Sequence, residues 1–273
     1  MQSSYMTFDF GQLHYQQAMS GKKQTILFLH GFNSSSASFS SLFELLKDRF
    51  NLVSLDFSGH GQSDPITDKK HLNYYTIQGL VEITTQFIRR LNLQNFYIAA
   101  SSMGCHMAVC AMPELKTLQG LVLIGCIHGR TKEKTMSCSF PEIGTIFNPT
   151  PNTSEITAIA SLSASSPEGI QQMMRDLKNN DGQFRKIYSS YYLEETNAWV
   201  DEIKLLEVSG LPHLHIQGVQ DKLINSIYYK DQLIKEGMKA SQIQLINDAG
   251  HMVHLDQSKA CATLIKDFIA QTT

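Results

Sequence analysis

A serine in a run of small residues, Ser102, is the first candidate for chemistry. It lies in the segment Ala100-Ser101-Ser102-Met103-Gly104, directly after an apolar run and directly before a stretch with helical spacing. A nucleophilic serine on a sharp strand-to-helix turn needs small residues two positions before and after it, because larger side chains would collide with the adjacent strand and helix. The pattern therefore predicts a nucleophile at Ser102. The alternative is a turn rich in small residues that has no chemical role.

A serine hydroxyl is a weak nucleophile until a base removes its proton, so the hypothesis requires a histidine nearby. His251 follows Ala249-Gly250 just beyond the last expected strand, at the edge of the sheet where Ser102 should also lie. His254, three residues later, is the rival base. Its alternative place is the pocket wall or the start of the final helix, and we carry it as a pocket candidate.

The imidazole of such a base needs a carboxylate that holds its tautomer and stabilises the imidazolium. Asp221 follows an apolar run at 213–217, on the same expected edge of the sheet. Asp248 is the nearest competitor, but it lies only three residues before His251 and is interpreted as a surface turn residue.

The tetrahedral intermediate of acyl transfer carries a negative oxygen, which must meet preorganised N–H donors. Met103, directly after the nucleophile, is expected to offer one backbone N–H at a helix N-terminus. Phe32, in His30-Gly31-Phe32 after the apolar run 25–30, is expected to offer the other. The side chain of Phe32 is also a pocket candidate, and a plain core role is its alternative.

Alternating strands and helices must position these residues. Apolar runs predict buried strands, and helical spacing of apolar residues separates them. The expected strands are 25–30, 51–55, 95–100, 120–126, 213–217 and 242–246. This alternation predicts an α/β fold with a mostly parallel central sheet flanked by helices.

The rhythm breaks between about His128 and Gly210, where helix-like pieces occur without a convincing buried strand. We expect a helical cap at 128–209, inserted into a core domain formed by 1–127 and 210–273. The cap carries many aromatic and methionine side chains. We expect it to cover an apolar pocket, with Tyr191 and Trp199 among the candidates for its wall.

Composition narrows the class of protein. Hydrophobic residues make up 42% of the 273 residues and charged residues 18%, as in a globular domain, and the net charge of −2 comes without a basic stripe for nucleic acid. The N-terminus lacks the regions of a secretory signal, and polar residues interrupt the uncharged stretch 91–113. We expect a cytoplasmic protein without a membrane span, a monomer or homodimer that acts on a small molecule.

Metals and cofactors find no signature in the sequence. The five cysteines form no C-x-x-C pair, which argues against a disulfide framework and a zinc knuckle. Neither His213-x-His215 nor His251-x-x-His254 has an acidic ligand cluster beside it, and no phosphate-binding glycine loop is present. We therefore expect no metal and no cofactor.

Five short motifs in chain order resemble those of the α/β-hydrolase superfamily. They are His30-Gly31-Phe32, Asp56 to Ser63, the segment around Ser102, Gly218 to Asp221, and Gly250-His251. The resemblance implies a Ser-Asp-His triad on an α/β-hydrolase fold. It leaves the substrate open, because this superfamily includes esterases, lactonases, C–C hydrolases, lyases and hormone receptors.

One branch is similar in more detail. Residues 249–257 and the loop that begins at His30 resemble the menaquinone-pathway SHCHC synthase, a lyase that eliminates pyruvate and needs arginines for carboxylates. Arg130, Arg175 and Arg185 lie in or beside the expected cap but match none of its motifs. Ala100 and Ser258 also depart from the residues usual in the superfamily, which are glycine and proline.

We therefore expect a serine hydrolase that cleaves a small carboxylic ester, thioester or lactone through an acyl-enzyme. The first alternative is a lyase in which the same triad abstracts a proton, and cap arginines that face Ser102 would favour it. The second is a small-molecule receptor with slow turnover, and the third a scaffold with an inert triad.

Overall fold

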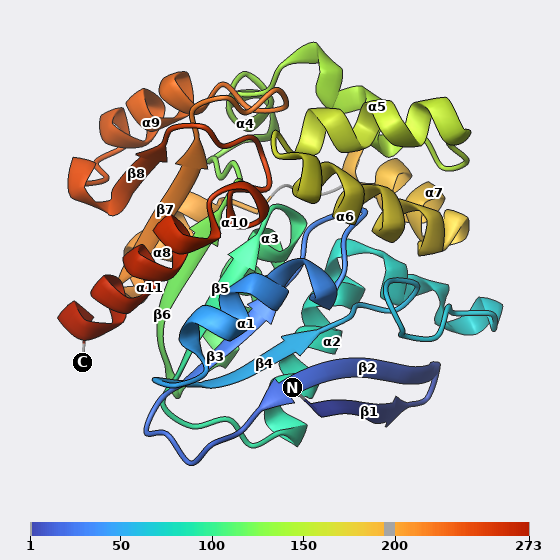
Figure 1. Ribbon diagram of the computed structural model, residues 1–273, viewed down its shortest axis with the longest axis horizontal. Coiled ribbons are helices and arrows are strands. Elements are labelled where there is room, and N and C mark those ends of the chain that lie inside the picture. The colour runs from blue at the N-terminus through green and yellow to red at the C-terminus, as the bar shows by residue number, and fades with distance from the viewer. Residues whose placement is uncertain (1, 194–199, 273) are drawn as a thin grey trace.

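Eight strands form one sheet in the order β1-β2-β4-β3-β5-β6-β7-β8 in the computed structural model, which describes residues 2–193 and 200–272, the side chains of 191–193 excepted (Figure 1). Strands β3 to β8 are parallel to one another, whereas β2 is antiparallel to both of its neighbours, β1 and β4. The predicted mostly parallel α/β sheet is confirmed. The strands are β1 (Gln2–Phe8), β2 (Gly11–Ala18), β3 (Thr25–Leu29), β4 (Asn51–Leu55), β5 (Phe96–Ser101), β6 (Leu118–Ile124), β7 (His213–Gly218) and β8 (Ile243–Ile246).

The N-terminal hairpin of β1 and β2 is the part of the sheet that the sequence did not reveal. A strand with one buried face shows alternating apolar and polar residues. In β2 the two fully buried residues, Leu13 and His14, are adjacent, and one of them is polar, so this alternation is absent. His14 is buried because its Nδ1 hydrogen-bonds the carboxylate of Asp56 at 2.7 Å. The burial of this position thus depends on a long-range hydrogen bond and not on an apolar side chain.

Helices cover both faces of the sheet, as the two-residue period of buried strands requires. One face packs against α1 (Ser40–Leu46) and α11 (Ser258–Thr272), through alternate residues such as Ile26 and Phe28. The other face packs against α2 (Ile77–Arg90) and α3 (Met103–Ala111), through Leu27 and Leu29. Figure 1 shows α1 and α11 in front of the sheet and α2 and α3 behind it.

Residues 128–209, the range of the expected cap, lie between β6 and β7 and are here called the inter-strand segment. It is helical wherever it has regular structure among the described residues. Figure 1 shows α5, α6 and α7 over one end of the sheet. Its α-helices are α4 (Lys132–Met136), α5 (Thr153–Ser163), α6 (Pro167–Asn179), α7 (Gly182–Leu193) and α8 (Glu202–Ser209), and a 3₁₀ helix, η4, spans Pro141–Phe147.

Local signals explain where two of these helices begin. Asn152 caps α5 by accepting the N–H of Glu155, whose carboxylate accepts the N–H of Asn152 in return. Pro167 opens α6, where its missing N–H costs nothing, and Ser166 caps the helix.

Polar side chains help to tie the inter-strand segment to the rest of the fold, as three contacts illustrate. Asp176 of α6 accepts a hydrogen bond from the Ser35 hydroxyl at 2.7 Å, and the Asn33 amide donates to the Ile146 carbonyl at 2.9 Å. Asp256 of α10 (Val253–Asp256) accepts the N–H of Ser166 at 2.8 Å. The segment is therefore held through named polar side chains as well as by apolar packing.

The remaining helix, α9 (Ser226–Lys235), lies between β7 and β8 in the chain. Over the part of the chain that the structure describes, the helices lack the combination of length and apolar character needed to cross a bilayer.

Candidate active site

Ser102 lies on a strained turn between β5 and α3. Its backbone has φ 49° and ψ −118°, a conformation that a residue with a side chain adopts only where the surroundings force it. Gly104 shows how tight the turn is, because a Cβ there would lie 2.4 Å from the carbonyl oxygen of Leu29. Ala100 is fully buried in β5 between Leu29 and Leu123, so this position accommodates a methyl group.

The structure brings Ser102, His251 and Asp221 together from three separate turns. The Ser102 Oγ lies 2.9 Å from the His251 Nε2, and the His251 Nδ1 lies 2.9 Å from an Asp221 carboxylate oxygen. Since an ionised carboxylate only accepts, Nδ1 carries the ring proton and Nε2 is left to accept the serine O–H. The imidazole is therefore in the tautomer that a general base for Ser102 requires.

Backbone groups hold the carboxylate of Asp221 in place. Its second oxygen accepts the N–H groups of Leu223 at 2.7 Å and Ile224 at 2.9 Å. The competitor Asp248 is exposed and has a φ of 55°. It is a turn residue, as expected.

Gly125 fixes the distance between the end of β6 and the His251 turn. Its φ is 57°, and a Cβ at this position would lie 2.0 Å from the carbonyl oxygen of His251. Its N–H donates to the Ile216 carbonyl of β7, while the Ser102 N–H donates to the Ile124 carbonyl of β6. Continuing sheet hydrogen bonds thus set the relative positions of the serine and histidine turns.

The loop that carries Phe32 lies directly against the serine, since a Cβ on Gly31 would come within 2.9 Å of the Ser102 Cβ. His30 anchors the loop. Its Nδ1 donates to the Gly31 carbonyl at 2.8 Å, and its Nε2 accepts the N–H of Phe57 at 3.0 Å. Met103 is the first residue of α3, so its N–H finds no acceptor within that helix.

Asp56 also holds the loop that carries Phe32, through the N–H of Ser36. The buried carboxylate accepts the N–H of Ser36 and the N–H of Gln62 in addition to its bond with His14. Burial acts to raise its pKa, but the hydrogen bond with His14 and the neighbouring charge of His30 outweigh it, and the pKa lies below its ordinary value. The carboxylate of Asp56 therefore has a structural role.

A largely apolar cavity opens beside Ser102 and has an empty volume of about 440 Å³, its mouth included. The sheet and its turns contribute one part of the wall and the inter-strand segment the other. The lining residues are Phe32, Ser102, Met103, His106, Gly125, Cys126, Ile127, Ile143, Ile146, Phe147, Tyr188, Leu223, Ile224 and His251. The ring of Phe32 packs against the rings of Phe147 and Tyr188, with centroids 5.3 and 5.2 Å apart.

The predicted pocket residues have different outcomes. Phe32 lines the cavity, and His254 does not. Tyr191 belongs to α7, but its side chain is outside the described part of the structure, and Trp199 lies outside the described residues.

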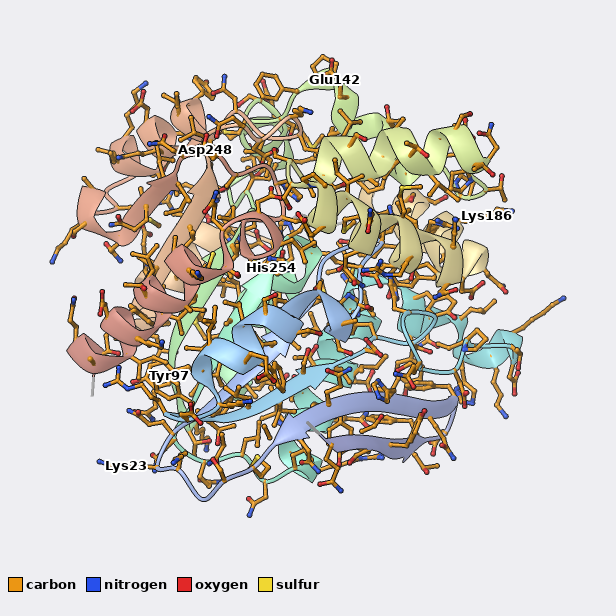
Figure 2. The ribbon with its side chains drawn as sticks, viewed as in Figure 1. Lys23, Tyr97, Glu142, Lys186, Asp248 and His254 are labelled. Carbon is orange, nitrogen blue, oxygen red and sulfur yellow. The ribbon has the colours of Figure 1, made fainter. Side chains whose placement is uncertain are left out.

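His254 is fully buried on α10, which Figure 2 shows above α1. Its ring stacks on Phe39 at 4.6 Å, and its Nε2 lies 3.4 Å from the Ser38 hydroxyl. Burial and the neighbouring His251 lower its pKa to about 3, so it stays neutral. His254 therefore lies in the core, where its ring packs on Phe39, and it does not line the cavity.

None of the three arginines that a lyase could use reaches the cavity. Arg130 pairs with Glu207 and Glu236. Arg175 donates to the Gln172 side chain, and Arg185 is buried and donates to the carbonyls of Leu177 and Asn180. The described lining of the cavity contains no arginine.

Sequence reasoning missed a buried group of polar side chains at the far wall of the cavity. The Nδ1 atoms of His106 and His128 each lie 2.8 Å from one oxygen of Glu202. Burial acts to raise the pKa of Glu202, but the charges of the two imidazoles lower it to about 2. The position of His106, one helical turn after Ser102, was a usable signal, whereas nothing in the sequence points to Glu202.

Comparisons with known proteins agree with this geometry. A family model described as alpha/beta hydrolase fold matches residues 24–258. Monoacylglycerol lipase ABHD6 of Bos taurus is 28% identical over 291 aligned residues, which cover 99% of this chain and 82% of the relative.

Two solved structures illustrate the likeness in fold. The N-acyl homoserine lactonase AidH, complexed with N-butanoyl homoserine, aligns with a TM-score of 0.86 at 16% identity, over 100% of this chain and 98% of that one. Carboxylesterase CesB (YbfK) from Bacillus subtilis aligns with a TM-score of 0.79 at 15% identity, over 100% and 92% of the two chains.

Proposed function

The chain belongs to the alpha/beta hydrolase fold family and is a hydrolase that acts on ester bonds, and on that basis we propose that Ser102 is its nucleophile. The observation that carries the proposal is the continuous hydrogen-bonded path from the Ser102 Oγ through His251 to Asp221, with 2.9 Å at each step. Each group in this path has the orientation that its role demands.

The reaction follows from that path. His251 Nε2 takes the proton of Ser102 as the Oγ attacks the carbonyl carbon of the substrate, and Asp221 stabilises the imidazolium that results. The proton then passes to the leaving alcohol, which departs as the acyl-enzyme forms. Water, deprotonated by His251, attacks the acyl group and regenerates the serine.

The backbone N–H groups of Phe32 and Met103 are the proposed donors to the negative oxygen of the intermediate. The helical position of Met103 supports its role, because the first N–H groups of a helix lack acceptors within it. The anchoring of the Phe32 loop by His30 supports the other, because a donor that is already held in place needs no reorganisation during the reaction.

The substrate class follows from the cavity wall. We assign residues 1–127 and 210–273 to a core domain and 128–209 to a helical cap that covers the pocket.

Ile143, Ile146 and Phe147 of the cap give the cavity an apolar wall next to Ser102. The preferred substrate is an ester whose acyl group is an aliphatic chain.

The positions of the arginines favour hydrolysis over the pyruvate-eliminating lyase reaction. A lyase of that kind needs cations for the carboxylates of its substrate. The side chains of Arg130, Arg175 and Arg185 are engaged with other groups, and the described cavity lining holds no arginine.

Labelling with a fluorophosphonate tests the nucleophile. We expect the wild type to gain one adduct by intact-mass spectrometry and to turn over p-nitrophenyl esters, and Ser102→Ala to do neither. The matched control is Ser101→Ala, which removes the neighbouring buried hydroxyl and should keep both. Labelling that persists in Ser102→Ala, or a wild type that neither reacts nor turns over, would overturn the mechanism.

A further inference from the structure

Two thiols and an imidazole converge at one wall of the cavity, which Cys126 itself lines. Cys105 lies in the first turn of α3, Cys126 follows β6, and His128 comes two residues later. Their Sγ and Nε2 or Nδ1 ligand atoms all lie within 4.8 Å of one another, and the Cys126 Sγ is 3.2 Å from the His128 Nε2. All three side chains are at most 3% exposed.

The spacing of these atoms fits a soft metal ion. Zinc binds thiolate sulfur at about 2.3 Å and imidazole nitrogen at about 2.0 Å, so donors around a tetrahedral ion are roughly 3.3–3.8 Å apart. The Cys126–His128 pair already has about this separation. Thiolate and imidazole together select zinc or monovalent copper over the hard cations that prefer oxygen.

Glu202 orients the imidazole for this purpose. It accepts the Nδ1–H of His128 at 2.8 Å, so that the neutral imidazole would present Nε2 to the two sulfurs. A carboxylate behind a ligating histidine is the usual partner in metal sites. Each thiol also has a hydrogen-bond partner, since the Cys105 Sγ lies 3.3 Å from the Ala100 carbonyl oxygen and the Cys126 Sγ lies 3.2 Å from the His128 Nε2. Zinc binding would therefore release both thiol protons.

Two thiolates neutralise the charge of a divalent ion, which lowers the desolvation penalty of burying it. Glu202 is held from its other side by His106, whose Nδ1 lies 2.8 Å from the other carboxylate oxygen.

We infer that Cys105, Cys126 and His128 form a zinc site, with Glu202 as the residue that orients His128. The site joins the helix that begins after Ser102 to the turn after β6 and, through Glu202, to α8. The sequence predicts no metal because these ligands lie on separate elements, 21 positions apart between the cysteines, with none of the spacings of known zinc motifs. The inference is independent of the hydrolase mechanism.

Metal content of the full chain tests the inference. We expect one zinc ion per chain, by elemental mass spectrometry with sulfur as the internal measure of protein, after exposure to a weak competing chelator. Cys126→Ser and His128→Gln should each lower the bound zinc at least about tenfold. The control Cys261→Ser removes a buried thiol on the opposite face of the sheet and should keep it. The same ratio is expected in Ser102→Ala, so that failure of the hydrolase mechanism does not affect the result.

Two further measurements cover variants that fold poorly. Cobalt added to the wild type after zinc removal should give a thiolate-to-metal charge-transfer band, which reports the sulfur ligands without any substitution. Glu202→Gln should weaken zinc binding about 10- to 100-fold, as loss of an orienting partner does. Zinc that stays below one-tenth of an ion per wild-type chain, binding that persists in Cys126→Ser, or a Cys105–Cys126 disulfide in the freshly purified chain would overturn the inference.

Discussion

The turns that carry Ser102, Asp221 and His251 and the inter-strand segment that carries Ile143 and Ile146 form opposite parts of one cavity, yet they are held in place differently. The turns continue the sheet, so backbone hydrogen bonds and close backbone contacts set their positions. The segment is held by apolar packing, by the side-chain contacts of Asp176, Asn33 and Asp256, and by separate backbone hydrogen bonds to loops outside the sheet. The difference suggests that the chemistry depends on the backbone, whereas substrate preference depends on exchangeable side chains.

The largest loss of kcat/KM should follow a substitution at one of the turns that leaves the volume of the side chain almost unchanged. In Asp221→Asn, an amide N–H can face His251, so that the ring proton moves to Nε2 and the base can no longer accept the serine proton. We expect kcat/KM for a p-nitrophenyl ester to fall about 10⁴-fold. The control Asp248→Asn, at an exposed turn, should stay at the wild-type value. A loss of less than tenfold in Asp221→Asn would show that the carboxylate is dispensable.

The same substitution of glycine by alanine should have opposite outcomes in the two regions. Gly125→Ala places a methyl group against the His251 carbonyl, at a positive φ, and should lower kcat/KM at least about 100-fold by displacing the imidazole. Gly144→Ala in the inter-strand segment meets no atom within 4 Å and should leave kcat/KM unchanged. Steady-state kinetics together with thermal melting distinguish displacement from unfolding. Equal effects of the two substitutions would contradict the comparison.

A substitution in the segment should change preference and leave the chemistry intact. Ile146→Phe fills part of the cavity, so kcat/KM for a p-nitrophenyl octanoate should fall about tenfold relative to the acetate. The matched control is Ile227→Phe, at an exposed position of α9. If Ile146→Phe slowed both esters equally, the segment would contribute to the chemistry as well as to selection.

The smallest effect on catalysis, with a clear effect on stability, is expected at Asp176. Burial raises the pKa of this carboxyl from 3.8 to about 6, although hydrogen bonds from Ser35 and Gln172 oppose the shift. Between these pH values the folded chain therefore binds more protons than the unfolded chain, and the free energy of unfolding falls as pH rises. The fall should reach up to about 3 kcal/mol.

Asp176→Asn should remove this part of the pH dependence while keeping ester turnover. Urea unfolding at pH 4 and pH 7 measures it, as the difference between wild type and variant at each pH. A difference that does not change with pH would show that Asp176 is ionised throughout and that the attachment of α6 is not sensitive to protonation.

The sequence predicted the parts of the site that depend on local sterics. Ser102, Asp221 and His251 each follow a strand, and parallel strands bring such turns to one edge of a sheet, so position in the chain was enough to predict that the three side chains meet. The small residues around Ser102 carry the same information, because the turn excludes larger ones.

Long-range polar contacts explain what could not be predicted. β2 was not predicted because His14 is a polar residue whose burial is compensated by a hydrogen bond with Asp56. Glu202 was not predicted because its two imidazole partners come from distant parts of the chain. His254 was assigned to the pocket from its distance in sequence to His251, but its side chain stacks on Phe39. Each of these outcomes depends on a partner more than forty positions away in the chain.

Asp256 has a consequence for protein engineering. Its carboxylate accepts the N–H of Gly250, next to His251, and also the N–H groups of Ser165 and Ser166 before α6. A chimaera that receives residues 128–209 from another hydrolase would therefore bring new neighbours to the carboxylate that also holds the His251 turn. The transferable module is the segment together with a compatible residue at position 256, and exchanges that ignore this pairing would alter rate as well as specificity.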